Sequence, residues 1–152
     1  MPGKTLMPRH EEQRVLPFSP EFIFDIVADV GAYPEFLPWC IKARVYRKKE
    51  DDFFSDVVIG FKMFRETWTS HVFLDKPNKI VSKYVRGPMK RLHNEWTFTP
   101  HAEGVLVKFM LDFEFKNPII QKLIGHLFDE AAHRMVKAFD ARAEELSKGT
   151  RT

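Results

Sequence analysis

The chain has 152 residues, of which 44% are hydrophobic and 30% charged, and its formal net charge is +3. These values are typical of one globular domain with its own core. A single cysteine excludes an intramolecular disulfide and a zinc site built from several cysteines. No apolar run approaches the ~20 residues that cross a bilayer, and the first ten residues lack the apolar stretch of a secretory signal. We therefore expect a cytoplasmic protein, whose 15 phenylalanines are its most unusual feature.

The N-terminal part predicts a strand, a helix and an irregular loop. Residues 5–16 are polar and extended, which indicates an edge strand. A helix should begin at Ser19-Pro20, because serine caps helices and proline suits the first helical position, and it should end at Gly31. The next segment, residues 33–40 (YPEFLPWC), holds two prolines that prevent a long regular helix. It is apolar enough that we expect it to fold onto the core or to close over a cavity.

From Ile41 to Lys116, apolar residues recur at every second position, which is the period of a strand with one buried face. Residues 105–116 show it best, because six apolar side chains share one parity. Turn signals separate the runs. Even spacing without intervening helices predicts an antiparallel meander of six strands at 41–48, 53–61, 64–74, 80–86, 90–99 and 105–116.

A final helix is predicted from Asn117-Pro118 to about Leu146. We expect it to cover the apolar face of the sheet, because no other predicted element is long enough. The fold class is therefore α+β of the helix-grip type: a curved antiparallel sheet of about seven strands wraps around a long C-terminal helix and leaves a cavity between them. Residues 1–152 are expected to form a single domain, with residues 146–152 frayed.

Parity also places polar residues on the apolar faces of two strands: Glu66 and Ser70 beside Phe64 and Trp68, and Lys90 and Asn94 beside Leu92 and Trp96. Buried polar groups need partners. A Glu66–Lys90 pair would satisfy both side chains, and contact with the polar head of a ligand would do so equally. A bulge that turns these side chains into solvent is the third possibility.

Signals for catalysis are weak. The sequence contains no GxSxG, GxGxxG, P-loop or HExxH motif, so we predict no catalytic residues. Cys40 lies in the apolar loop and is expected to be a packed thiol. His126, Glu130 and His133 have the helical spacing of a metal site, but this pattern is common on polar helix flanks, and we predict no metal.

Basic residues cluster at 42–49 and 86–91. Such clusters can contact phosphates or anionic lipid headgroups, or can simply be solvated. The aromatic residues follow the buried parity instead of facing outward with Lys and Arg, which argues against base stacking. We predict no DNA binding, whereas contact with ribosomal RNA through charge stays open.

Three motifs occur in order along the chain: SPEFIFDIVADVGAYPEFLPWC at 19–40, FKMFRETWTSHV at 61–72 and GPMKRLHNEWTF at 87–98. With the closing helix, they resemble the coenzyme Q-binding protein family of the START-like, polyketide-cyclase-related superfamily, from about Leu6 to Leu146. Met89 stands where that family favours phenylalanine. A neighbouring branch of ribosome-association toxins tends to have Pro-Gly-Cys in the loop, so Trp39 favours the quinone-binding branch.

The resemblance implies a non-catalytic carrier that needs no cofactor and holds a polyprenylated benzoquinone, ubiquinone, between sheet and helix. It would deliver the quinone to respiratory complexes, or support its biosynthesis, in peripheral contact with the inner membrane. A ribosome-binding inhibitor of subunit association is the alternative, and a cyclase or aromatase is a third reading. The predicted ligand-binding residues are Trp39, Phe64, Glu66, Trp68, Lys90, Leu92, Asn94, Trp96, Phe109 and Leu127.

Overall fold

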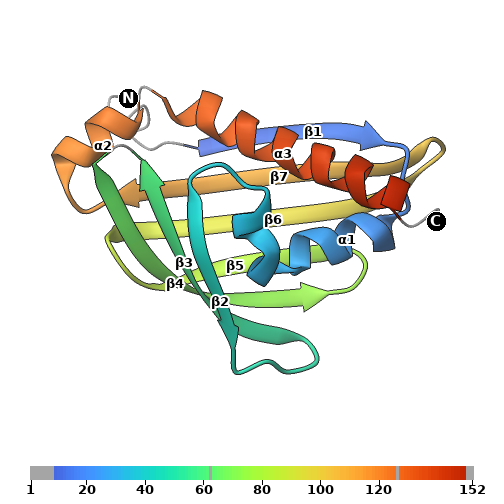
Figure 1. Cartoon of the computed structure of the whole chain (residues 1–152), viewed down its shortest axis with the longest axis horizontal. Coiled ribbons are helices and arrows are strands. Elements are labelled where there is room, and N and C mark those ends of the chain that lie inside the picture. Colours follow the sequence, from blue (N-terminus) through green and yellow to red (C-terminus); the bar gives the residue numbers. More distant parts are fainter. Residues whose placement is uncertain (1–8, 62, 126, 150–152) are drawn as a thin grey trace.

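The computed structural model describes residues 9–61, 63–125 and 127–149. Within them, seven strands form one antiparallel sheet in the order β1-β7-β6-β5-β4-β3-β2 (Figure 1). The predicted meander is confirmed, and β1 pairs with β7 at an edge of the sheet; residues 5–8 of the predicted first strand lie outside the described residues. The strands are β1 (Arg9–Leu16), β2 (Cys40–Tyr46), β3 (Asp52–Phe61), β4 (Phe64–Asp75), β5 (Lys79–Arg86), β6 (Met89–His101) and β7 (Gly104–Phe115).

The helix α1 (Pro20–Ala28) begins where the sequence predicts, with the Ser19 hydroxyl accepting a hydrogen bond from the Phe22 N–H at 3.1 Å. It ends at Ala28, before the predicted Gly31, because the 3₁₀ turn η2 (Val30–Glu35) follows immediately. The Tyr33 hydroxyl donates a hydrogen bond back to the Val27 carbonyl and so fixes this turn on α1.

The predicted C-terminal helix is broken into α2 (Pro118–Gly125) and α3 (Phe128–Gly149). The expectation of one continuous helix is wrong, and the break follows Gly125, a residue type that weakens helix interiors. The Leu127 N–H donates to the Ile124 carbonyl, and the Ala131 N–H donates to the Leu127 carbonyl, which starts α3. Helix α3 continues past the predicted end at Leu146, and residues 150–152 of the expected frayed tail lie outside the described residues.

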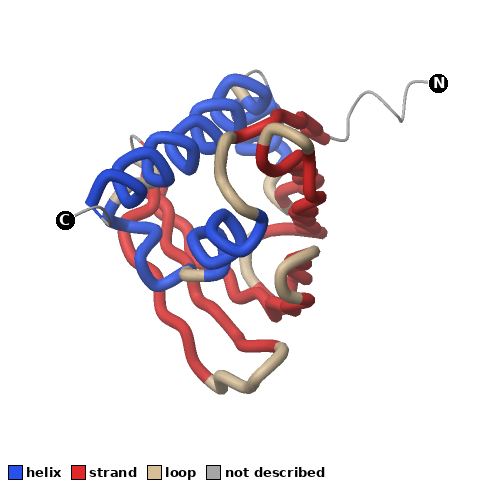
Figure 2. The backbone as a smooth tube through the Cα atoms, turned by 90° about the vertical axis from the view of Figure 1, so that its right-hand side faces the viewer, coloured by secondary structure: helices blue, strands red, loops and turns tan. Residues whose placement is uncertain are grey.

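The strands curve around the helices, which lie on one face of the sheet (Figure 2). This confirms the helix-grip fold. The main core packs α1 and α3 against the sheet and includes Trp96, Phe98, Phe109 and Phe139. A second cluster lies beneath α2; its buried members are Met89, Leu92, Phe113, Phe115 and Phe128, and Trp68, Ile120 and Ile124 pack against it. No helix in the described part of the chain is both long and apolar enough to cross a bilayer.

Candidate functional site

Helix α3 passes over β1 (Figure 1), and charged side chains of the two elements form ion pairs with one another. His10, Glu12 and Arg14 alternate along β1, so their side chains share one face of the strand. Positions 129, 133 and 140 of α3 are spaced to lie on one side of a helix. The two sets meet as an ion-pair row, which we define as His10, Glu12, Arg14, Asp129, His133 and Asp140.

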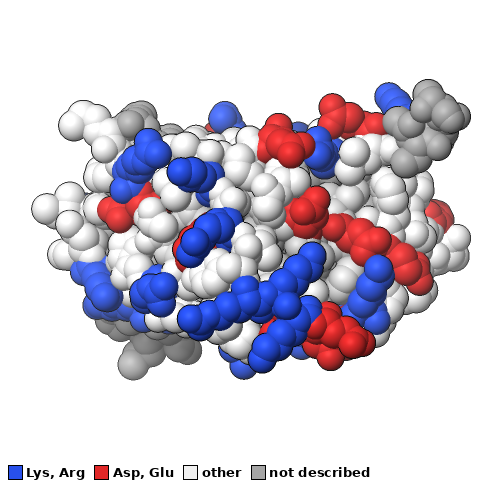
Figure 3. Space-filling model, turned by 60° about the horizontal axis from the view of Figure 1, so that its bottom comes forward, with Lys and Arg blue, Asp and Glu red and all other residues white. Residues whose placement is uncertain are grey.

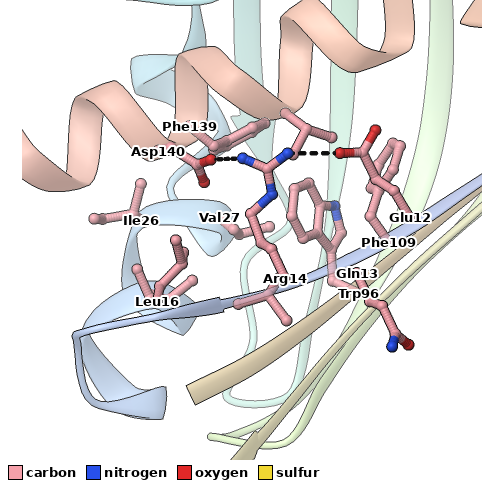
Figure 4. Close-up of a pocket in the computed structure, with 13 residues that line it drawn as sticks. Glu12, Gln13, Arg14, Leu16, Ile26, Val27, Trp96, Phe109, Phe139 and Asp140 are labelled. Carbon is pink, nitrogen blue, oxygen red and sulfur yellow. Dashed lines mark hydrogen bonds and ion pairs between the residues drawn. The ribbon is translucent and has the colours of Figure 1, made fainter. Parts of the chain in front are cut away.

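Arg14 is the centre of this row (Figure 4). Its Nη1 donates to the Asp140 carboxylate, and its Nη2 donates to Glu12 Oε1 at 2.9 Å. The Nε atom is buried and has no acceptor among the described residues. Because a buried donor without an acceptor costs free energy, this N–H is the most distinctive polar feature of the interior.

A small cavity of about 10 Å³ adjoins Arg14, between β1, β6, β7 and the two helices that cover them. Its polar wall is Glu12, Arg14 and Asp140, and its apolar wall includes Trp96 and Phe109. The rings of Trp96 and Phe109 lie 4.6 Å apart. A cavity of this size holds about one water molecule, so α3 must move away from the sheet before a larger molecule enters.

Burial and hydrogen bonds shift the pKa values of the row in opposite directions. Burial by itself lowers the pKa of His10, but its hydrogen bonds to Glu12 and Asp129 outweigh burial and raise that pKa. Burial by itself raises the pKa of Glu12, but hydrogen bonds from His10 and His133 outweigh it and lower that pKa. Burial raises the pKa of Asp140, and Arg14 offsets only part of this effect.

The raised pKa of His10 predicts pH-dependent stability. The protonated imidazole is stabilised in the folded state, so its contribution is complete below the ordinary pKa of 6.5 and is lost as the pH rises through the raised value. Between about pH 5.5 and about pH 8.5, the native protein should lose more free energy of unfolding than the His10→Gln variant. Urea denaturation at both pH values measures this difference. Equal pH dependence of the two proteins would show that His10 does not couple protonation to folding.

The structure places four of the predicted ligand-binding residues in or against the two clusters. Trp96 and Phe109 belong to the main core and line the small cavity. Leu92 belongs to the second cluster, where Trp68 packs against it. Asn94 is half-buried between them, and its side-chain amide donates to the Met110 carbonyl at 2.8 Å.

Three predicted residues lie nearer the surface. Phe64 and Glu66 are half-buried at the start of β4 and alternate with exposed neighbours. Leu127 lies at the break between α2 and α3 and is 42% exposed. None of these three residues lines the small cavity.

Trp39 is half-buried in the turn before β2, and its carbonyl accepts a hydrogen bond from the Gly60 N–H at 2.9 Å. Its φ is 67°, in the left-handed region that favours glycine. A side chain costs roughly 1 kcal/mol in this conformation. The loop at 33–40 therefore has a tryptophan at a position where glycine would be less strained.

The prediction that Lys90 points into the interior is wrong. A bulge between Met89 and Arg91 reverses the local parity, so that Met89 is buried and Lys90 faces outward. Its Nζ lies 3.4 Å from Glu114 Oε2, which replaces the pair with Glu66 that the sequence left open. Lys90 is therefore not a residue of the interior.

Aromatic side chains also lie on the outer face of the sheet, contrary to our expectation that they follow the buried parity. The Phe54 and His71 rings stack with their centroids 4.1 Å apart. Arg44 lies 4.4 Å over the Tyr46 ring. We call this set the outer ladder; its members are Arg44, Tyr46, Phe54, His71, Phe73 and Lys83.

The remaining reactive side chains have structural surroundings. Cys40 is half-buried, and burial raises the pKa of its thiol. Among the described residues, no group of three His, Cys, Asp or Glu side chains is placed to hold a metal ion. Of the spaced trio on the last helix, Glu130 pairs with Arg134, His133 lies near Glu12, and His126 lies outside the described residues.

The ion-pair row was not predicted from the sequence. The sequence signal for the row is that His10, Glu12 and Arg14 share one parity with Leu16 along the predicted edge strand. Inward-pointing charges are one way to protect an edge strand. Their partners on α3 could be identified only once the helix had been placed over β1.

Comparison with known proteins agrees with the fold. Residues 16–140 match the family described as polyketide cyclase / dehydrase and lipid transport. The solution structure of an 18 kDa protein from Caulobacter crescentus has a TM-score of 0.77 and is 33% identical, covering 93% of this chain and 99% of its own.

Two curated relatives come from the two branches that the sequence motifs suggest. The ribosome association toxin RatA of Rickettsia prowazekii is 34% identical over 91% of this chain and 97% of its own length. The mitochondrial coenzyme Q-binding protein COQ10 homolog B of Xenopus laevis is 31% identical over 90% of this chain and 58% of its own length. The chain, whose fold is START-like, therefore belongs to the polyketide cyclase / dehydrase and lipid transport family.

Proposed function

We propose that the protein binds a prenylated benzoquinone, such as ubiquinone, between the sheet and α3 and acts as its carrier. The observation that carries this proposal is the Nε–H of Arg14, a buried donor that finds no acceptor among the described residues and lies beside an apolar cavity. A quinone carbonyl is an acceptor of the right kind, and it carries no charge that the interior would have to compensate. Helix α3 would open to admit it.

The apolar interior suits the rest of such a ligand. Trp96, Phe109 and Phe139 form aromatic contacts around the cavity beside Arg14. The second cluster extends the apolar interior toward α2. Burying a prenyl tail there contributes about 25 cal/mol for each Å² removed from water, which offsets the cost of displacing α3.

Trp39 supports the quinone-binding branch over the toxin branch. Its backbone has a positive φ that is strained for a bulky side chain, in the loop expected to fold onto the core or to close over a cavity. Strain of this kind is concentrated at ligand clamps and switch regions. In this proposal the protein catalyses no reaction; it is cytoplasmic, contacts the inner membrane peripherally and delivers ubiquinone to respiratory complexes or to its biosynthesis.

Titration with a short-chain ubiquinone tests the proposal. Because Trp96 lines the cavity, a bound quinone should quench tryptophan fluorescence with saturation at one equivalent. A benzoquinone without a prenyl tail should bind at least about tenfold more weakly, because it buries less apolar surface. Linear, unsaturated quenching by both compounds would contradict quinone binding.

Association with a ribosomal subunit is the second candidate function. The RatA relative supports it, and the outer ladder presents cations and aromatic rings on one face of the sheet. Such a face can contact RNA through phosphates and stacked bases. Co-sedimentation with isolated ribosomal subunits, lost at high salt and in an Arg44→Gln/Lys83→Gln variant, would support this function.

A further inference from the structure

The molecule has an exposed apolar surface at the end where α2 lies. Met63, in the β3–β4 turn, is 95% exposed, and Ile119, near the start of α2, is 75% exposed. Leu123 and Leu127 are each 42% exposed. Large apolar side chains gathered at one place mark an interaction surface more often than chance exposure does.

Helix α2 is apolar on two sides. Ile120 and Ile124 pack inward on the second cluster, whereas Ile119 and Leu123, spaced four residues apart, face outward. Trp68 of β4 packs on the same cluster, so the β3–β4 turn and α2 lie at the same end of the molecule (Figure 1). The exposed surface therefore lies directly over the apolar interior.

Cations accompany this surface. Arg65, Lys116 and Lys122 are exposed, and none of them forms an ion pair with another described residue. In Figure 3, Lys and Arg side chains lie over the left and centre of the face shown, and most Asp and Glu side chains lie toward the right. The left side of that view is the end that carries α2.

We propose that this surface, defined as Met63, Arg65, Lys116, Ile119, Lys122, Leu123 and Leu127, docks on an anionic lipid bilayer. Ile119, Leu123 and Met63 enter the boundary between headgroups and acyl chains, as the apolar face of an interfacial helix does. The neighbouring cations contact lipid phosphates. The inference rests on the proposed carrier function in one respect only, because it names the surface through which a lipid would reach the second cluster.

Vesicle co-sedimentation without quinone tests the docking surface separately from quinone binding. The purified protein should bind vesicles of phosphatidylcholine and phosphatidylglycerol more tightly than vesicles of phosphatidylcholine alone. Raising the salt concentration from about 0.1 M to about 1 M should weaken the binding, because the Debye length falls from ~10 Å to ~3 Å. Ile119→Ser and Leu123→Ser should each weaken it by about tenfold.

Two controls separate docking from general effects. Val15→Ser replaces another exposed apolar residue, 38% exposed on β1, and should bind vesicles like the native protein. Lys116→Gln/Lys122→Gln should remove the preference for phosphatidylglycerol. Circular dichroism should show every variant folded, because the replaced side chains are largely exposed.

Three outcomes would overturn the proposal. Native binding by both Ile119→Ser and Leu123→Ser would exclude insertion of α2. A dimer that Ile119→Ser dissociates, without vesicle binding by the native protein, would identify the surface as a contact between copies. Loss of ribosomal co-sedimentation in Ile119→Ser, again without vesicle binding, would identify it as a ribosome contact.

Discussion

Replacing Trp96 with alanine is expected to lower the free energy of unfolding by about 3–5 kcal/mol. The side chain is 4% exposed. The centroid of its ring lies 4.6 Å from that of Phe109 and 5.0 Å from that of Phe139. It therefore joins the sheet to α3. Truncation to alanine removes the aromatic ring that lies between the sheet and α3. It leaves a cavity that the surrounding side chains can fill only in part. Urea denaturation followed by far-UV circular dichroism measures the loss.

Phe54→Ala is the matched control for Trp96→Ala. Phe54 is an aromatic residue of the same sheet, but it lies half-buried in the outer ladder, so its loss should cost clearly less. A Trp96→Ala variant as stable as the native protein would show that Trp96 lines a ligand site and does not support the core. Such a result would favour a ligand cavity that is already open in the free protein. The cavity of about 10 Å³ beside Arg14 argues against one.

Replacing Arg14 with methionine is expected to weaken ubiquinone binding by about tenfold or more. A hydrogen bond to a charged group contributes about 1.5–3 kcal/mol, and each 1.4 kcal/mol is about a tenfold change in affinity. The same fluorescence titration measures the effect. The variant should also be less stable, because Asp140 and Glu12 lose the cation that compensates their charge.

Two further variants separate binding from stability. Lys108→Met removes an exposed cation from β7 and should change neither property. Arg14→Met/Asp140→Leu removes both partners of the ion pair and should recover stability without recovering affinity. Native affinity in Arg14→Met would contradict the role of the Nε–H, whatever the change in stability.

The strands were predictable from sequence because one buried face imposes a period of two. Residues 64–74 and 105–116 were therefore predicted within one residue of each strand end. The outward direction of the Lys90 side chain was not predicted, because a bulge adds a residue to one strand and reverses the parity beyond it. The bulge between Met89 and Arg91 left no distinct mark in the sequence.

The helical part and the site show where sequence patterns lose information. The apolar stripe of the last helix continues across Gly125, so the pattern alone predicted one helix where there are α2 and α3. The contacts of the ion-pair row between β1 and α3 join residues 119 or more positions apart, such as His10 and Asp129. Contacts of this range depend on how elements pack, which the sequence periodicity does not encode.

The central claim is that the interior between the sheet and α3 holds a prenylated quinone. The most direct test is to purify the protein without detergent, extract it with organic solvent and identify the extracted compounds by mass spectrometry. We predict that a prenylated benzoquinone is recovered from the native protein and is depleted from Arg14→Met. Recovery of no quinone from native protein that co-sediments with a ribosomal subunit would contradict the claim and would establish the second candidate function.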